Sequence, residues 1–105
     1  MTAQVAADLR AAAEVLERDG WTQGKYRRGD CRCLIGALVA VCDGNDGESS
    51  VPAEEQVRLS TLMVAMERQL GTGWDLDGWN DTPGRTADEV VAALRAAADA
   101  AEEQG

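Results

Sequence analysis

Apolar side chains recur at steps of three and four residues over most of this chain, which is the spacing of an amphipathic helix. The first stripe consists of Val5, Leu9, Ala12 and Leu16. It predicts a helix that begins at Thr2, a residue able to cap it, and runs to about Asp19. Gly20 follows and ends this helix.

The next two apolar segments predict one buried helix and one amphipathic helix. The segment from Cys31 to about Cys42 has hardly any polar face, and Asp30 precedes it as a candidate N-cap. A helix that is apolar all round is buried all round, so we expect it at the centre of the fold. A third helix has Pro52 in its first turn and ends at Gly71. Its inward stripe is Leu59, Leu62, Met63, Met66 and Leu70.

The C-terminal part predicts a short helical turn over Trp74 to Trp79 and then a last helix. Thr86 and Glu89 have the spacing of a capping box, which marks where that helix begins. Its inward residues are Val90, Leu94, Ala97 and Ala101. The whole pattern predicts an all-α fold over residues 1–105 in one domain, a compact and mostly antiparallel bundle of four main helices.

Charge and composition narrow the function classes. The chain has 105 residues, a formal net charge of −9 and no histidine. An acidic chain is poorly suited to bind nucleic acid directly, because that requires clustered cations. The charges are unevenly distributed along the sequence. A basic patch consists of Lys25, Arg27, Arg28 and Arg32. An acidic run consists of Asp43, Asp46, Glu48, Glu54 and Glu55. No segment approaches the roughly 18 apolar residues of a membrane span, and we expect no membrane partner.

The three cysteines predict reduced thiols and neither a metal site nor a bound cofactor. Without histidine the chain lacks the usual zinc ligands, catalytic triads and general base. On one helix Cys31 and Cys33 would diverge by about 200°, and Cys31 and Cys42 would lie about 16 Å apart, too far for a disulfide. Cys31 remains a candidate reactive thiol if it sits at a helix N-terminus beside Arg28 and Arg32. An odd number of cysteines and no signal peptide favour a cytoplasmic location.

The richest polar segment is Trp79–Thr86, just ahead of the last helix. Thr82-Pro83-Gly84-Arg85 has the composition of a β-turn. The structural interpretation has Asp81 pair with Arg85 across that turn and Trp79 anchor the segment in the core. The functional interpretation makes the segment part of an interaction surface, because Trp and Arg dominate binding hot spots. That candidate surface comprises Trp79, Asn80, Asp81, Arg85, Lys25, Arg27 and Arg28.

Three motifs together resemble a known family. They are Gly20-Trp21-x-Gln23-Gly24, Cys33-Leu34-Ile35-Gly36-Ala37-Leu38, and Trp79-Asn80-Asp81-x-Pro83-Gly84-Arg85-Thr86 followed by Glu89-Val90. The chain is similar over roughly residues 5–98 to small uncharacterised proteins of actinobacteria and their phages. The resemblance implies a lineage and no activity. Nine arginines to one lysine fit a GC-rich genome.

These observations predict a non-enzymatic protein-interaction module, encoded by an actinobacterium or its phage, that binds a host protein. One alternative is an acidic DNA mimic that inhibits a DNA-binding enzyme. Another is a small ligand-binding protein or enzyme that uses Asp75, Asp77, Asp81 and Arg85. A homodimer is compatible with all three.

Overall fold

Five helices and one very short hairpin make up the part of the chain that the computed structural model describes, which is residues 2–24, 27–28, 31–43, 53–71 and 75–104. The helices are α1 (Thr2–Asp19), α2 (Leu34–Asp43), α3 (Ala53–Leu70), α4 (Leu76–Asn80) and α5 (Ala87–Gln104). The strands are β1 (Arg27–Arg28) and β2 (Cys31–Arg32). The all-α prediction is confirmed, with four long helices and α4 as the short turn before the last one.

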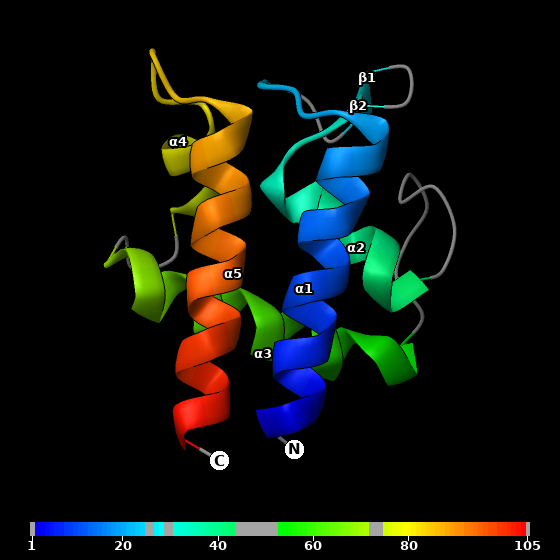
Figure 1. Cartoon of the computed structure of the whole chain (residues 1–105). Coiled ribbons are helices and arrows are strands. Elements are labelled where there is room, and N and C mark those ends of the chain that lie inside the picture. The colour runs from blue at the N-terminus through cyan, green and yellow to red at the C-terminus, as the bar shows by residue number, and fades with distance from the viewer. Residues whose placement is uncertain (1, 25–26, 29–30, 44–52, 72–74, 105) are drawn as a thin grey trace.

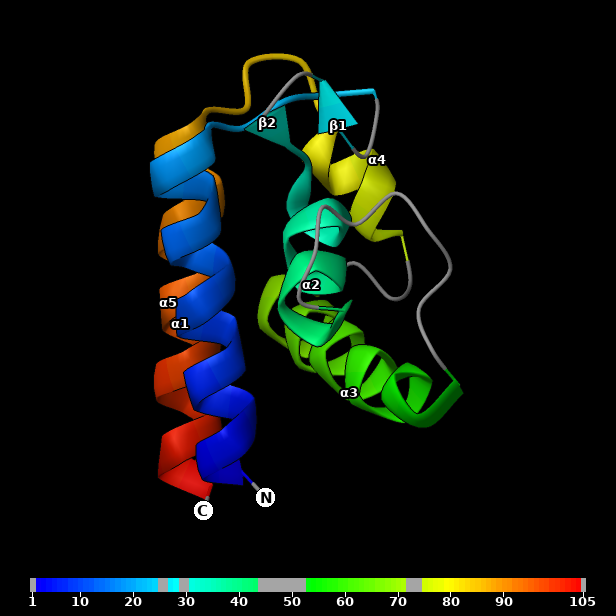
Figure 2. The same ribbon diagram turned by 90° about the vertical axis from the view of Figure 1, so that its right-hand side faces the viewer.

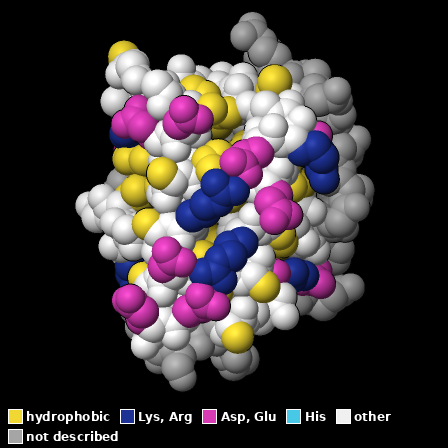
Figure 3. Space-filling model, in the orientation of Figure 1, with side chains coloured by type: hydrophobic (Ala, Val, Ile, Leu, Met, Phe, Trp, Pro, Cys, Tyr) yellow, Lys and Arg dark blue, Asp and Glu magenta, His cyan; other side chains and the backbone are white. Residues whose placement is uncertain are grey.

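The helices α1 and α5 lie antiparallel along their whole length, so that the two chain ends meet at one end of the molecule (Figure 1). Their facing sides consist largely of buried alanines, among them Ala6, Ala13, Ala97 and Ala98, which let the two backbones approach closely. Arginines of each helix pair with acids of the other: Arg10 reaches Asp99 at 2.8 Å, and Arg95 reaches Glu17. In the orientation of Figure 3, basic and acidic side chains therefore alternate over this face.

The helix α2 is central, as its apolar sequence predicts. Leu34, Ala37 and Leu38 have no exposed surface, and Cys42 is also buried. However, the helix begins at Leu34 and not at Cys31, so the predicted N-cap at Asp30, which lies outside the described residues, is wrong. Cys33 occupies the cap position instead, and its Sγ accepts a hydrogen bond from the Gly36 N–H at 3.3 Å.

The later start of α2 has a local cause in backbone pairing. Cys31 and Arg32 pair antiparallel with Arg28 and Arg27. Arg32 also exchanges two backbone hydrogen bonds of 3.0 Å with the segment after α1, one with Gly20 and one with Thr22. The sequence predicts a plain loop here. Strands of two residues are too short to show an alternation of hydrophobic and polar side chains, so the sequence pattern could not predict this hairpin.

The helix α3 runs across the α1–α5 pair, on the side where α2 lies (Figures 1 and 2). The predicted antiparallel packing is therefore present for α1 and α5. The helix α3 crosses this pair instead of lying alongside it. Its buried residues Leu62 and Met66 belong to the predicted inward stripe. One ion pair ties the crossing: Arg58 of α3 donates to the buried carboxylate of Asp8 in α1 at 2.6 and 2.8 Å.

The predicted start of the last helix is confirmed in detail. The Glu89 N–H donates to Thr86 Oγ1 at 3.2 Å, and the Thr86 N–H donates to Glu89 Oε1 at 2.9 Å, which is the capping box. The β-turn before it is also present, with the Arg85 N–H bonded to the Thr82 carbonyl at 3.0 Å and Gly84 at φ +87°. Within the described residues no helix is long and apolar enough to cross a membrane.

Candidate functional site

Asn80 is the centre of the Trp79–Thr86 segment and is only 1% exposed. Its Oδ1 accepts from the Trp21 indole N–H at 2.7 Å and from the Leu34 N–H at 3.0 Å. Its Nδ2 donates to the Thr22 carbonyl at 3.2 Å and to Asp81 Oδ1 at 3.0 Å. An amide offers two donors and two lone pairs, so all four are used inside the fold.

Asn80 thereby joins three segments that are far apart in sequence. Trp21 and Thr22 follow α1, Leu34 is the first residue of α2, and Asn80 is the last residue of α4. The first backbone N–H groups of a helix have no partner within the helix, and the bond from Leu34 to Asn80 satisfies one of them. Asn80 is consequently an architectural joint and has no capacity left for a ligand.

Asp81 and Gln23 surround this joint. Asp81 Oδ1 accepts from the Gly24 N–H at 2.8 Å. This bond and the one from Asn80 lower the pKa of Asp81. The Gln23 amide donates to the carbonyls of Asn80 and Thr82, each at 3.0 Å. The loop after α1 is thus bound to the end of α4 by side chains on both sides.

Arg85 packs on Trp79 and does not pair with Asp81. Its guanidinium carbon lies 4.0 Å from the centroid of the half-buried Trp79 ring. Arg85 Nε donates to the Trp79 carbonyl at 3.0 Å, and Nη1 lies 3.3 Å from Glu89 Oε2. The predicted Asp81–Arg85 pair is therefore wrong: Gly24 and Asn80 engage the carboxylate, while Arg85 turns back over Trp79.

The three aspartates of the candidate ligand cluster do not converge. Asp75 caps α4 by accepting from the Gly78 N–H at 3.0 Å. Asp77 is exposed on the first turn of α4, and Asp81 is bound to Gly24. Among the residues that the structure describes, no three cysteine or acidic side chains form a group suited to hold a metal ion.

The predicted basic patch is only partly described. Lys25 lies outside the described residues, and so do the side chains of Arg27 and Arg28. Arg32 does not belong to an exposed patch: it is 8% exposed and donates to Asp19 at 2.8 Å. The acidic run likewise falls mostly outside the described residues.

The cysteines are three free thiols. Cys33 and Cys42 are buried and Cys31 is half-buried. Burial raises the pKa of the Cys33 thiol, which makes this cysteine less reactive. Since Cys31 lies in β2 and precedes α2 by three residues, the predicted activation of its thiol by a helix N-terminus does not apply.

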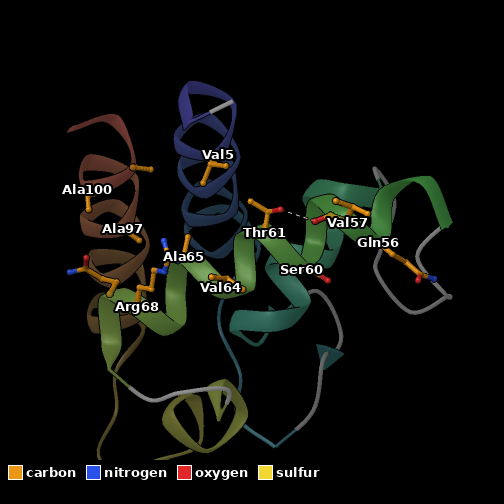
Figure 4. A pocket seen from close by; sticks show the side chains of 12 residues that line it. Val5, Gln56, Val57, Ser60, Thr61, Val64, Ala65, Arg68, Ala97 and Ala100 are labelled. Atoms are coloured by element: carbon orange, nitrogen blue, oxygen red, sulfur yellow. Dashed lines mark hydrogen bonds between the residues drawn. The ribbon is translucent and has the colours of Figure 1, made fainter. Parts of the chain in front are cut away.

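A groove lies at the other end of the molecule, beside the chain ends (Figure 4). One side is the outer face of α3, and the other is formed by the ends of α1 and α5 that extend past α3 (Figure 2). The groove has a volume of about 690 Å³. Its α5 wall consists of alanines, and Val5 of α1 adds to it; these wall residues are Val5, Ala97, Ala100 and Ala101.

The α3 side of the groove carries the two large hydrophobic side chains that are exposed among the described residues. Val57 is 74% exposed and Val64 is 42% exposed. Together with Ser60, Thr61 and Arg68 they form what we call the α3 outer stripe, defined as Val57, Ser60, Thr61, Val64 and Arg68. The polar Ser60 and Thr61 separate the two valines, so the stripe presents two exposed aliphatic side chains on a partly polar face.

The α3 outer stripe is not among the predicted site residues, although the sequence contains a signal for it. Val57 and Val64 are seven residues apart, two helical turns, and point away from the inward stripe that contains Leu62 and Met66. Two aliphatic residues on the polar face of an amphipathic helix indicate a second apolar contact. Only the structure shows that these valines line the same groove as the alanines of α5.

Arg68 gives the groove its charge. Seven arginines have side chains within the described part of the chain, and six of them pair with an acid: Arg10, Arg18, Arg32, Arg58, Arg85 and Arg95. Arg68 alone makes no ion pair with a described residue, and it is exposed in the groove wall. The groove therefore combines an apolar lining with one available cation.

Comparison with known proteins gives a family whose function is unknown. No curated protein and no solved structure matches the chain. A model described as a family of unknown function, DUF6197, matches residues 1–100. Since that match covers nearly all of the sequence, the chain belongs to this family of unknown function, DUF6197.

Proposed function

We propose that this chain acts by binding another protein in the α3 groove and that it catalyses no reaction. The observation that carries the proposal is the exposure of Val57 and Val64 along the α3 side of the groove, which is also lined by Val5 and by alanines of α5. A groove of this composition suits the apolar face of a helix, which binds by burying residues one and two turns apart.

The Trp79–Thr86 segment supports the same proposal by exclusion of a rival surface. The hydrogen-bonding groups of the Asn80 side chain all have partners within the fold, and the Arg85 guanidinium packs on the Trp79 ring. A ligand-binding cluster of Asp75, Asp77, Asp81 and Arg85 would require these groups to converge. Two of the three carboxylates accept backbone N–H groups instead, Asp75 from Gly78 and Asp81 from Gly24.

The acidic DNA-mimic alternative has less support. A mimic of the phosphate backbone needs a face of one sign. On the α1–α5 face the acids Glu17, Asp99 and Glu102 are neutralised by Arg10 and Arg95.

The resemblance to proteins of actinobacteria and their phages extends the proposal to the source and the target. We propose that an actinobacterium or its phage encodes the chain and that the partner is a protein of the host cell. The excess of arginine over lysine, nine to one, agrees with such a genome.

A comparison of two charge insertions tests the proposal. Immobilised wild-type chain, Val64→Glu and Ala92→Glu are incubated with an actinobacterial lysate. Ala92 is exposed on α5 outside the groove, so its variant adds the same charge elsewhere. We expect a protein that wild type and Ala92→Glu retain and that Val64→Glu retains at least about tenfold less, since a buried unpaired carboxylate is costly. Equal retention by all three chains, or none above a charge-matched control, would count against the groove.

A further inference from the structure

We propose that the groove binds an amphipathic helix of the partner protein, which runs antiparallel to α3 and carries an acidic side chain in its first turn. The inference rests on the proposed function, because it names the chemistry of the partner for the same groove. It is carried by the spacing of the two exposed valines and by the charge and position of Arg68.

The two valines determine the apolar pattern of the partner. Val57 and Val64 are 74% and 42% exposed. They lie on one face of α3, two helical turns and about 10 Å apart along its axis, with Ser60 and Thr61 between them (Figure 4). A helix packed alongside α3 therefore covers both valines when it has two aliphatic residues that are also two turns apart.

Arg68 determines the charge of the partner. It follows Val64 by one helical turn and is exposed. Among the described residues that line the groove, it is the only charged side chain, although the whole chain has a net charge of −9. It also makes no ion pair with a described residue. An acidic side chain of the partner placed here gains an ion pair, whereas a basic one meets a like charge.

The direction of the partner helix follows from where an acid is most favourable. Arg68 lies in the last turn of α3. The first turn of a helix favours an acid and the last turn disfavours it, because of the unpaired backbone groups at the two ends. An antiparallel partner brings its first turn to Arg68. Its pattern is then an acidic residue, an aliphatic residue four positions later against Val64, and a second one seven positions further against Val57.

Two isomeric synthetic peptides test the position of the acid. Both are sixteen-residue helices of alanine and glutamine, with leucines in the seventh and fourteenth positions. One has glutamate in the third position, on the leucine face, and the other has it in the first position, on the opposite face. The isomers therefore share their composition, their net charge and an acid in the first turn. We expect the isomer with the acid on the leucine face to bind wild type about threefold more tightly in fluorescence anisotropy titrations, as suits an exposed ion pair.

Two protein variants of equal net charge show whether Arg68 causes the difference. Arg68→Gln and Ala92→Glu each make the chain more negative by one charge, and Ala92 is exposed outside the groove. We expect Arg68→Gln to remove the difference between the isomers and Ala92→Glu to preserve it. Val64→Glu should weaken both isomers at least about tenfold, since it places a carboxylate in the apolar contact. Circular dichroism melts check that each variant folds. Equal binding of the isomers to wild type, or a difference that persists in Arg68→Gln, would overturn the inference.

The two proposals fail separately. If the isomers bind wild type equally or not at all, and Val64→Glu still loses a lysate protein that Ala92→Glu retains, the groove binds a protein but the acidic-helix inference is wrong. If the isomers differ as expected and all chains retain the same lysate proteins, the groove selects an acidic helix but the host-protein proposal is wrong.

Discussion

A single buried amide can decide how a small helical domain is assembled. Asn80 satisfies an indole N–H, a helix N-terminal N–H, a carbonyl and a carboxylate at once. The Leu34 N–H and the Thr22 carbonyl belong to buried residues and are costly to leave unpaired. The four bonds together therefore determine which segments meet. That role explains why a polar residue lies among the fully buried side chains.

Replacing Asn80 should therefore be among the most damaging substitutions in this end of the molecule. We expect Asn80→Ala to lower the free energy of unfolding by about 3 kcal/mol, because the N–H groups of Trp21 and Leu34 lose their acceptor. Urea denaturation measures the loss, with Asp77→Ala as an exposed control in the same helix. A loss below about 1 kcal/mol would mean that water replaces the amide.

Asp81 should contribute a pH-dependent part of the stability. Its pKa in the folded chain is lowered from 3.8, mainly by the Gly24 N–H and then by Asn80. The carboxylate therefore stabilises the fold above the unfolded pKa, and this contribution is lost as the pH falls below about 4 through the folded pKa. We expect Asp81→Asn to unfold with a weaker pH dependence below about pH 4 than wild type. An unchanged slope in acid urea titrations would contradict this assignment.

At the scale of elements, the sequence predicts the long helices well and the connections poorly. The ends of α1 and α3 and the start of α5 follow from Gly20, Gly71 and the capping box at Thr86, because these signals are local. The start of α2 is not local. Cys31 and Arg32 are held in strands by backbone partners, and Leu34 is capped by Asn80, 46 residues away.

The same distinction applies to the candidate sites. Turn chemistry in Thr82–Arg85 could be predicted, whereas the stacking of Arg85 on Trp79 depends on where the chain turns in space. The groove could not be predicted at all, since its walls come from α3 and from the ends of α1 and α5. The sequence already places the two valines on the polar face of α3. That they line a groove becomes clear only from the neighbouring helices.

The crossing of α3 over α1 gives a prediction of its own. Asp8 is 4% exposed, and Arg58 supplies two of its hydrogen bonds. We expect Arg58→Met to cost about 3 kcal/mol in unfolding free energy, because it leaves a buried carboxylate without its counter-ion. Adding Asp8→Asn to Arg58→Met should recover part of this loss. Additive losses in the double-mutant cycle would show that the two side chains are not coupled.

At the scale of the whole molecule, the structural joint around Asn80 and the proposed binding groove lie at opposite ends. The joint around Asn80 lies beside the hairpin and α4, and the groove lies beside the chain ends (Figures 1 and 4). One end uses its polar groups internally, and the other leaves valines and an arginine exposed. This separation is the central claim, because it predicts that stability and binding can be changed independently.

The most direct test of that claim is the unfolding free energy of Val64→Glu measured beside that of Asn80→Ala. Val64 is 42% exposed, so we expect Val64→Glu to stay within about 0.5 kcal/mol of wild type, as surface substitutions do. Asn80→Ala should lose about 3 kcal/mol in the same urea titration. A Val64→Glu chain destabilised as much as Asn80→Ala would contradict the account, because Val64 would then belong to the folded core and not to a binding surface.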